Sequence, residues 1–131
     1  MQNWKYVKKI MNPESIQKYG ELYSFRFDND TETFLLTHNN GRPSLNEVQN
    51  HDELVFDKLL SFNKDDIENV FKTRESLRGL LRPTLMPIGA DPFGNYFCID
   101  QDSGAIVFWE HESTNETKIA ESLLQLVDLL Q

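Results

Sequence analysis

The sequence predicts an α+β fold in which an antiparallel sheet of about four to six strands has helices packed mainly on one side. Helical patterns dominate the N-terminal part and the C-terminal end, whereas strand patterns joined by short loops follow from residue 89 onward. Loops of hairpin length join antiparallel neighbours, because a parallel connection needs a dozen or more residues. No repeat, low-complexity tract or linker divides the chain, so residues 1–131 are expected to form one domain.

The first helix is predicted between Asn12 and Gly20. Asn12 can cap it, Pro13 suits the first helical position, and glycine commonly ends a helix. Residues 23–27 then alternate between aromatic and other side chains, which favours a brief strand or extended segment.

A second helix is expected from the capping residue Asp28 to about His38, because a run of turn-forming residues at 39–43 must end it. The stretch 53–62 is rich in large apolar residues, which indicates a strand.

A third helix is predicted to begin between Asn63 and Asp66. Its apolar residues fall at positions i, i+3, i+4 and i+10, so that they form one buried stripe. These residues are Ile67, Val70, Phe71 and Leu77.

The hairpin at 89–112 is the most specific part of the sequence. It begins with a tight turn of glycine and aspartate and continues into a strand. Because side chains alternate along a strand, Phe97 and Ile99 share one face, and Tyr96 and Cys98 share the other.

The return strand of this hairpin, residues 105–109, is apolar on both faces and is therefore expected to be central and covered on both sides. Gly104 supplies the positive φ that the preceding loop needs. Residues 118–120 are predicted to form a short edge strand. An amphipathic helix then closes the chain, with apolar positions at Leu123, Leu124, Val127 and Leu130.

The net charge of −8 is unevenly distributed. Residues 1–20 carry a net charge of +3, residues 21–83 carry −4, and residues 84–131 carry −7. Such an acidic C-terminal portion repels phosphate backbones, so direct nucleic-acid binding is not expected. It would attract a basic protein, although acidic residues also serve solubility alone.

Neither a membrane-spanning nor a secretory segment is predicted. No apolar run approaches the roughly 20 residues that cross a bilayer, and residues 1–11 lack the continuous apolar region of a signal peptide. A cytoplasmic location is therefore expected. The single cysteine, Cys98, cannot form an internal disulfide and is either a buried structural thiol or a nucleophile.

No motif for catalysis, a metal ion or a cofactor is complete. His111 and Glu112 begin like the helix of zinc proteases, but Asn115 stands where the second histidine belongs. Residues 100–104 begin like a calcium loop, but Ala105 replaces the glycine that the sharp turn requires. We therefore predict no catalytic residue, no metal site and no cofactor.

Three segments carry a resemblance to a known family. They are an Asn-Gly turn at 40–43, a signature with Pro-Ile-Gly, Asp and Gly-Asn at 86–95, and a strand ending in an aromatic residue and His-Glu at 104–112. They resemble the SUKH superfamily, which includes fungal cell-wall assembly regulators and many bacterial immunity proteins against contact-dependent or polymorphic toxins. The chain departs from the family pattern at 22–24, where Leu-Tyr-Ser stands in place of Leu-Pro.

The resemblance implies a non-catalytic immunity protein that binds a cognate toxin, with nucleases among the candidates, and neutralises it by covering its surface. The acidic C-terminal portion and the lack of a catalytic motif agree with this function. The alternatives are a regulatory or scaffolding module that binds other proteins, and an enzyme with a cryptic site.

The residues expected to bind the partner lie in or beside the hairpin. They are Asp91, Asn95, Asp102, Trp109, Glu110 and Glu112. Asp91 and Asn95 could instead hold their loop by bonding its amides. Trp109 is either a core residue or an exposed anchor, because tryptophan is enriched at binding hot spots.

Overall fold

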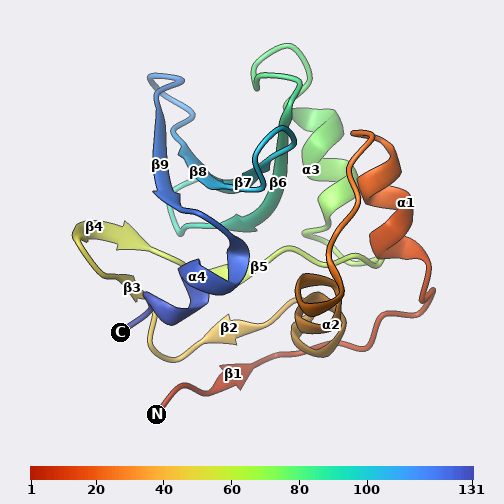
Figure 1. Cartoon of the computed structure of the whole chain (residues 1–131), viewed down its shortest axis with the longest axis horizontal. Coiled ribbons are helices and arrows are strands. Elements are labelled where there is room, and N and C mark those ends of the chain that lie inside the picture. The colour runs from red at the N-terminus through yellow and green to blue at the C-terminus, as the bar shows by residue number, and fades with distance from the viewer.

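The computed structural model describes all residues from 1 to 131 and has the predicted α+β class (Figure 1). Its main sheet has five antiparallel strands in the order β5-β6-β7-β8-β9. The bounds are Lys58–Leu59 for β5, Leu85–Ala90 for β6, Tyr96–Asp100 for β7, Ile106–Trp109 for β8 and Glu116–Ala120 for β9. The helices are α1 (Ser15–Glu21), α2 (Asn29–His38), α3 (Val70–Ser76) and α4 (Leu123–Asp128).

Two short antiparallel ribbons lie outside the main sheet. In the first, β1 (Trp4–Lys5) pairs with β2 (Arg42–Pro43), and in the second, β3 (Glu47–Val48) pairs with β4 (His51–Val55). None of the four helices is both long enough and apolar enough to cross a membrane.

The main sheet is buried on both faces at its centre. On one face, Phe97 and Ile99 join a core of 24 buried residues to which all four helices contribute. On the other face, Cys98 joins a smaller core of five buried residues. The predicted alternation along this strand is therefore confirmed. All four residues of β8 are buried, as expected for a central strand.

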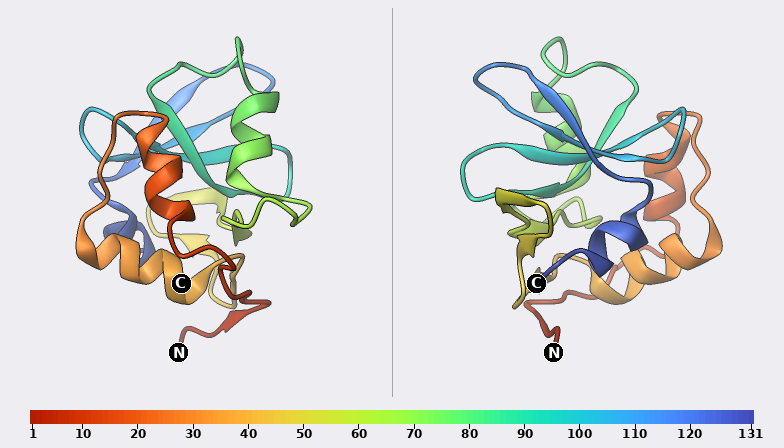
Figure 2. Two further views of the ribbon diagram at one scale, coloured as in Figure 1. Left: turned by 90° about the vertical axis from the view of Figure 1, so that its right-hand side faces the viewer. Right: turned by 60° about the vertical axis from the view of Figure 1, so that its left-hand side comes forward.

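Helices α1 and α3 lie side by side next to the sheet (Figures 1 and 2). The rings of Tyr19 in α1 and Phe71 in α3 meet edge to face with their centroids 5.6 Å apart. The buried hydroxyl of Tyr19 donates a hydrogen bond of 2.6 Å to the carbonyl of Pro87 in β6, which joins the helix to the sheet.

The first helix begins later than predicted. The Asn12 side chain accepts a hydrogen bond from the Glu14 amide, and its carbonyl accepts one from Ser15, so residues 12–14 form a turn before α1. The predicted extended segment at 23–27 is not a strand. Its alternation has another cause, because Tyr23 and Phe27 turn into the larger core.

Asp28 caps α2 as predicted, accepting a hydrogen bond of 2.8 Å from the Thr31 amide. The prediction of a single strand at 53–62 is wrong. Strand β4 ends at Val55, and β5 covers only two residues, because the chain changes partners in between. The Phe56 amide donates to Asn46, whereas the next amide donates to Ala90 of the main sheet.

The third helix begins at Val70 and not between Asn63 and Asp66. Asn69 is its cap, because its side chain accepts from the Lys72 amide at 2.9 Å. The preceding residues form a turn, and Ile67 is 92% exposed. The prediction that Ile67 belongs to a buried stripe is therefore wrong.

Two strands extend beyond the sequence pattern. Residues 85–90 form the fully buried strand β6, so the turn predicted at Gly89 is wrong and begins only after Ala90. A Cβ atom on Gly89 would lie 2.7 Å from two ring carbons of Phe56, so glycine is needed for β6 to pack this closely. The predicted edge strand at 118–120 begins at Glu116, and the closing helix α4 is capped by Ser122.

Candidate functional site

The six residues expected to bind a partner do not form one cluster. In an antiparallel meander, successive turns lie at opposite ends of the sheet. The β6–β7 turn, with Asp91 and Asn95, therefore lies at the same end as the β8–β9 connection, with Glu110 and Glu112. Asp102 is in the β7–β8 turn at the other end.

Asp91 uses its carboxylate to build the β6–β7 turn. Its Oδ1 atom accepts hydrogen bonds of 2.8 Å from the amides of Phe93 and Asn95. Its Oδ2 atom accepts one of 2.9 Å from the Asn95 side-chain amide. Gly94 completes the turn with a φ of +88°. These bonds support the structural role for Asp91.

Asn95 joins this turn to the β8–β9 connection. Its Oδ1 atom accepts a hydrogen bond of 3.0 Å from the His111 amide and lies 2.8 Å from Nδ1 of the same residue. The His111 ring also packs over Gly94, 3.5 Å from where a Cβ would be. The two loops therefore form one hydrogen-bonded unit at this end of the sheet.

Trp109 is not a surface anchor. Its side chain is 2% exposed and belongs to the smaller core. That core contains Leu77, Leu85, Cys98, Val107 and Trp109. The interpretation of Trp109 as an exposed partner-binding residue is therefore wrong. The segment after α3 supplies Leu77 and covers this face of the sheet.

We give the name acidic end to Asp52, Glu53 and Glu110, which line one groove, together with Glu112, which follows Glu110 in the β8–β9 connection. Residues of β4 and β8–β9 line a shallow groove there, namely His51, Asp52, Glu53, Leu54, Phe108, Glu110 and Thr117. The β3–β4 ribbon and the β8–β9 connection both lie on the left of Figure 1, and the right panel of Figure 2 brings this side forward.

The negative charge of the acidic end is largely uncompensated. Asp52, Glu53 and Glu110 form no side-chain hydrogen bond or ion pair. The one ionisable partner of the Glu112 side chain is the His111 ring, at a distance of 3.9 Å. The nearby Arg82 is already paired, with Glu116 at 2.9 Å and with Asp100 at 3.3 Å. This surface therefore attracts cations and basic protein surfaces.

Sequence reasoning missed Phe93. Its side chain is 70% exposed at the tip of the turn that Asp91 and Asn95 hold. Proline before and glycine after a phenylalanine predict a turn tip, where a large side chain has few neighbours to cover it.

Cys98 lacks the environment of a reactive thiol. It is fully buried with Leu85 and Val107 in the smaller core, and this burial raises the pKa of the thiol far above its ordinary value. A nucleophilic cysteine needs a lowered pKa and access to solvent. The thiol is therefore a packing group.

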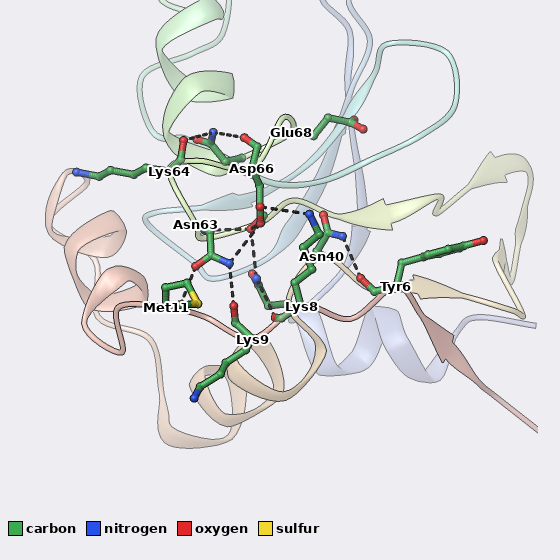
Figure 3. A network of polar contacts seen from close by, with 12 residues as sticks. Tyr6, Lys8, Lys9, Met11, Asn40, Asn63, Lys64, Asp66 and Glu68 are labelled. Atoms are coloured by element: carbon green, nitrogen blue, oxygen red, sulfur yellow. Dashed lines mark hydrogen bonds and ion pairs between the residues drawn. The ribbon is translucent and has the colours of Figure 1, made fainter.

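A second polar cluster lies where the N-terminal segment crosses the loop before α3 (Figure 3). Asp66 accepts hydrogen bonds from Ser61 and Asn63 and forms an ion pair of 3.2 Å with Lys8. Asn63 also donates to the Lys9 carbonyl and accepts from the Met11 amide, both at 2.8 Å. The polar groups of this cluster are hydrogen-bonded to one another, and these bonds hold residues 8–11 against the rest of the fold.

The buried Lys58 belongs to a neighbouring part of this cluster. Its ammonium group donates a hydrogen bond of 2.8 Å to Asn40, whose amide in turn donates to the Tyr6 carbonyl at 3.0 Å. Burial lowers the pKa of Lys58, and Glu68 at 3.7 Å opposes this effect. Its polar partners come from the fold itself, which indicates a structural role.

Comparison with known proteins places the chain in a family. No curated protein sequence matches it. The model of the SMI1 / KNR4 family (SUKH-1) matches residues 11–128 and leaves outside only the segment with β1 and the last three residues. The matched range contains the main sheet, the four helices and the acidic end. The chain therefore belongs to the SMI1 / KNR4 family (SUKH-1).

Proposed function

We propose that this protein is a non-catalytic immunity protein that binds a cognate bacterial toxin and neutralises it by covering its surface. The SUKH family includes toxin immunity proteins, and the family match extends over residues 11–128. The observation that carries the proposal for this chain is the acidic end, whose carboxylates have no lysine or arginine partner within the fold.

A toxin with a basic surface fits this charge best. Nucleases are such proteins, because they bind the phosphate backbone of their substrate with lysine and arginine side chains. Complementary charge raises the association rate, and salt lowers this rate by screening. We place the complex in the cytoplasm, where a nuclease toxin would meet nucleic acid.

Co-expression with the adjacent open reading frame tests the proposal. We expect the chain to co-purify with a large protein that has a toxic C-terminal domain, and to restore growth of cells expressing that domain. Recovery of several unrelated cellular proteins and no toxin would favour the alternative, a regulatory or scaffolding module.

Matched charge variants test the role of the acidic end. Replacing Glu110 and Glu112 with glutamine should lower the association rate with the toxin about tenfold at low salt and weaken its salt dependence. The control replaces Glu14 and Glu21 with glutamine in and beside α1. If both double variants bind equally fast, the acidic end is not the binding surface.

A further inference from the structure

We propose that Phe93 is the apolar anchor of the interface with the toxin, and that the toxin offers an apolar pocket bordered by lysine or arginine side chains. This inference rests on the proposed function and adds to it the binding centre and the chemistry of the partner surface.

Phe93 is the exception among the phenylalanines of this chain. The sequence has nine of them, and Phe93 alone is exposed, with 70% of its surface accessible. The other eight are buried or half-buried, all of them in or against the larger core. An aromatic ring held in water contributes little to folding, whereas aromatic residues are enriched in the cores of protein interfaces.

The backbone that carries Phe93 is held before any partner arrives. The Phe93 amide itself donates to Asp91, and Asn95 connects the turn to the backbone of His111. Pro92 restricts φ on the preceding side. A side chain on such a turn loses little conformational freedom on binding, because only its own two torsions become fixed.

The surroundings of Phe93 define the partner. Glu110 and Glu112 flank His111, which contacts the Phe93 turn through Asn95 and Gly94. An apolar anchor beside free carboxylates fits an apolar pocket with a cationic border. A second copy of this chain fits poorly, because a symmetric contact would place the two acidic ends against each other.

Leu80 provides a matched control outside the Phe93 turn, in a pocket that it shares with Thr114 and Glu116. It is 62% exposed on the loop after α3, but it lies between Arg78 and Arg82 in the sequence. Both arginines are paired within the fold, Arg78 with Glu75 and Arg82 with Glu116 and Asp100. Leu80→Ala therefore removes an exposed apolar side chain of similar accessibility from a surface whose charges are already paired.

The experiment measures the dissociation constant for the purified C-terminal domain of the toxin encoded by the adjacent gene. We expect Phe93→Ala to weaken binding by at least about 30-fold, mainly through faster dissociation. Phe93→Leu should retain most of the affinity, and Leu80→Ala should change it less than about threefold. A photo-crosslinking phenylalanine analogue at position 93 should attach to the toxin, whereas one at position 80 should not.

The outcomes separate the inference from the proposed function. If the wild-type chain binds the toxin and Phe93→Ala binds it equally well, the anchor is wrong and the immunity function stands. If the wild-type chain does not bind the toxin, the immunity function fails, and the anchor fails with it. An unchanged melting temperature of Phe93→Ala confirms that any loss of binding does not come from unfolding.

Discussion

Trp109 and Phe93 lie at the same end of the main sheet but in opposite environments. Trp109 ends a strand whose face is covered by the segment after α3, and 2% of its surface is exposed. The Phe93 side chain stands at the tip of its turn, and 70% of its surface is exposed. An aromatic residue therefore stabilises the fold or remains available for recognition according to what the rest of the chain places over it.

Thiol reactivity tests whether the core around Trp109 is closed. Cys98 lies in this core, and burial raises its pKa, so little thiolate forms in the native state. We expect a disulfide reagent such as dithionitrobenzoate to react with native Cys98 more than about a thousandfold more slowly than with the protein unfolded in urea. Equal rates would mean that this core opens readily.

Removing the Trp109 side chain tests its assignment to the core. Trp109→Ala should lower the free energy of unfolding by about 3–5 kcal/mol, because it leaves a cavity beside Leu85 and Val107. Urea denaturation measures this change. Phe93→Ala is the matched control and should change the same quantity by less than about 0.5 kcal/mol. Equal stability of the two variants would contradict the assignment of Trp109 to the core and of Phe93 to the surface.

Loosening the turn tests whether Phe93 needs a fixed backbone. Asp91→Ala removes three hydrogen bonds to the turn and should lower the free energy of unfolding by about 1–2 kcal/mol. It should also weaken toxin binding while leaving Phe93 in place. Asp102→Ala, in the turn at the opposite end of the sheet, serves as the control. Equal binding by both variants would show that rigidity of the Phe93 turn is unimportant.

The smallest expected effect concerns Asp66, whose carboxylate fastens the N-terminal segment. The hydrogen bond from Ser61 is the main cause that lowers the pKa of Asp66 below its ordinary value of 3.8. The ionised group therefore stabilises the fold above that value, and the contribution is lost as the pH falls through the lower folded pKa.

Unfolding of Asp66→Asn between pH 2 and 6 measures this contribution, which should be about 1 kcal/mol or less. The variant should lose less stability than the wild type on acidification. Asp65→Asn, at the exposed neighbouring position, should keep the wild-type pH profile. An unchanged profile in Asp66→Asn would contradict the assignment.

Local signals in the sequence were sufficient for several elements. The Asp28 cap located the start of α2, and the alternation around Phe97 predicted correctly which residues of β7 share a face. The signature at 86–95 correctly predicted the family. These features depend on neighbours within a few residues, where side-chain spacing and capping chemistry are visible in the sequence.

The burial of individual side chains could not be predicted from such local signals. Ile67 fits a helical stripe, yet Asn69 starts the helix later and leaves Ile67 in solvent. Trp109 and Phe93 are both aromatic residues near acidic neighbours, and only the packing of Leu77 and Leu85 on one of them separates their roles. The chain alone established an acidic α+β domain of a known family. Which aromatic residue remains exposed depended on contacts between distant segments, because exposure is a property of the assembled surface.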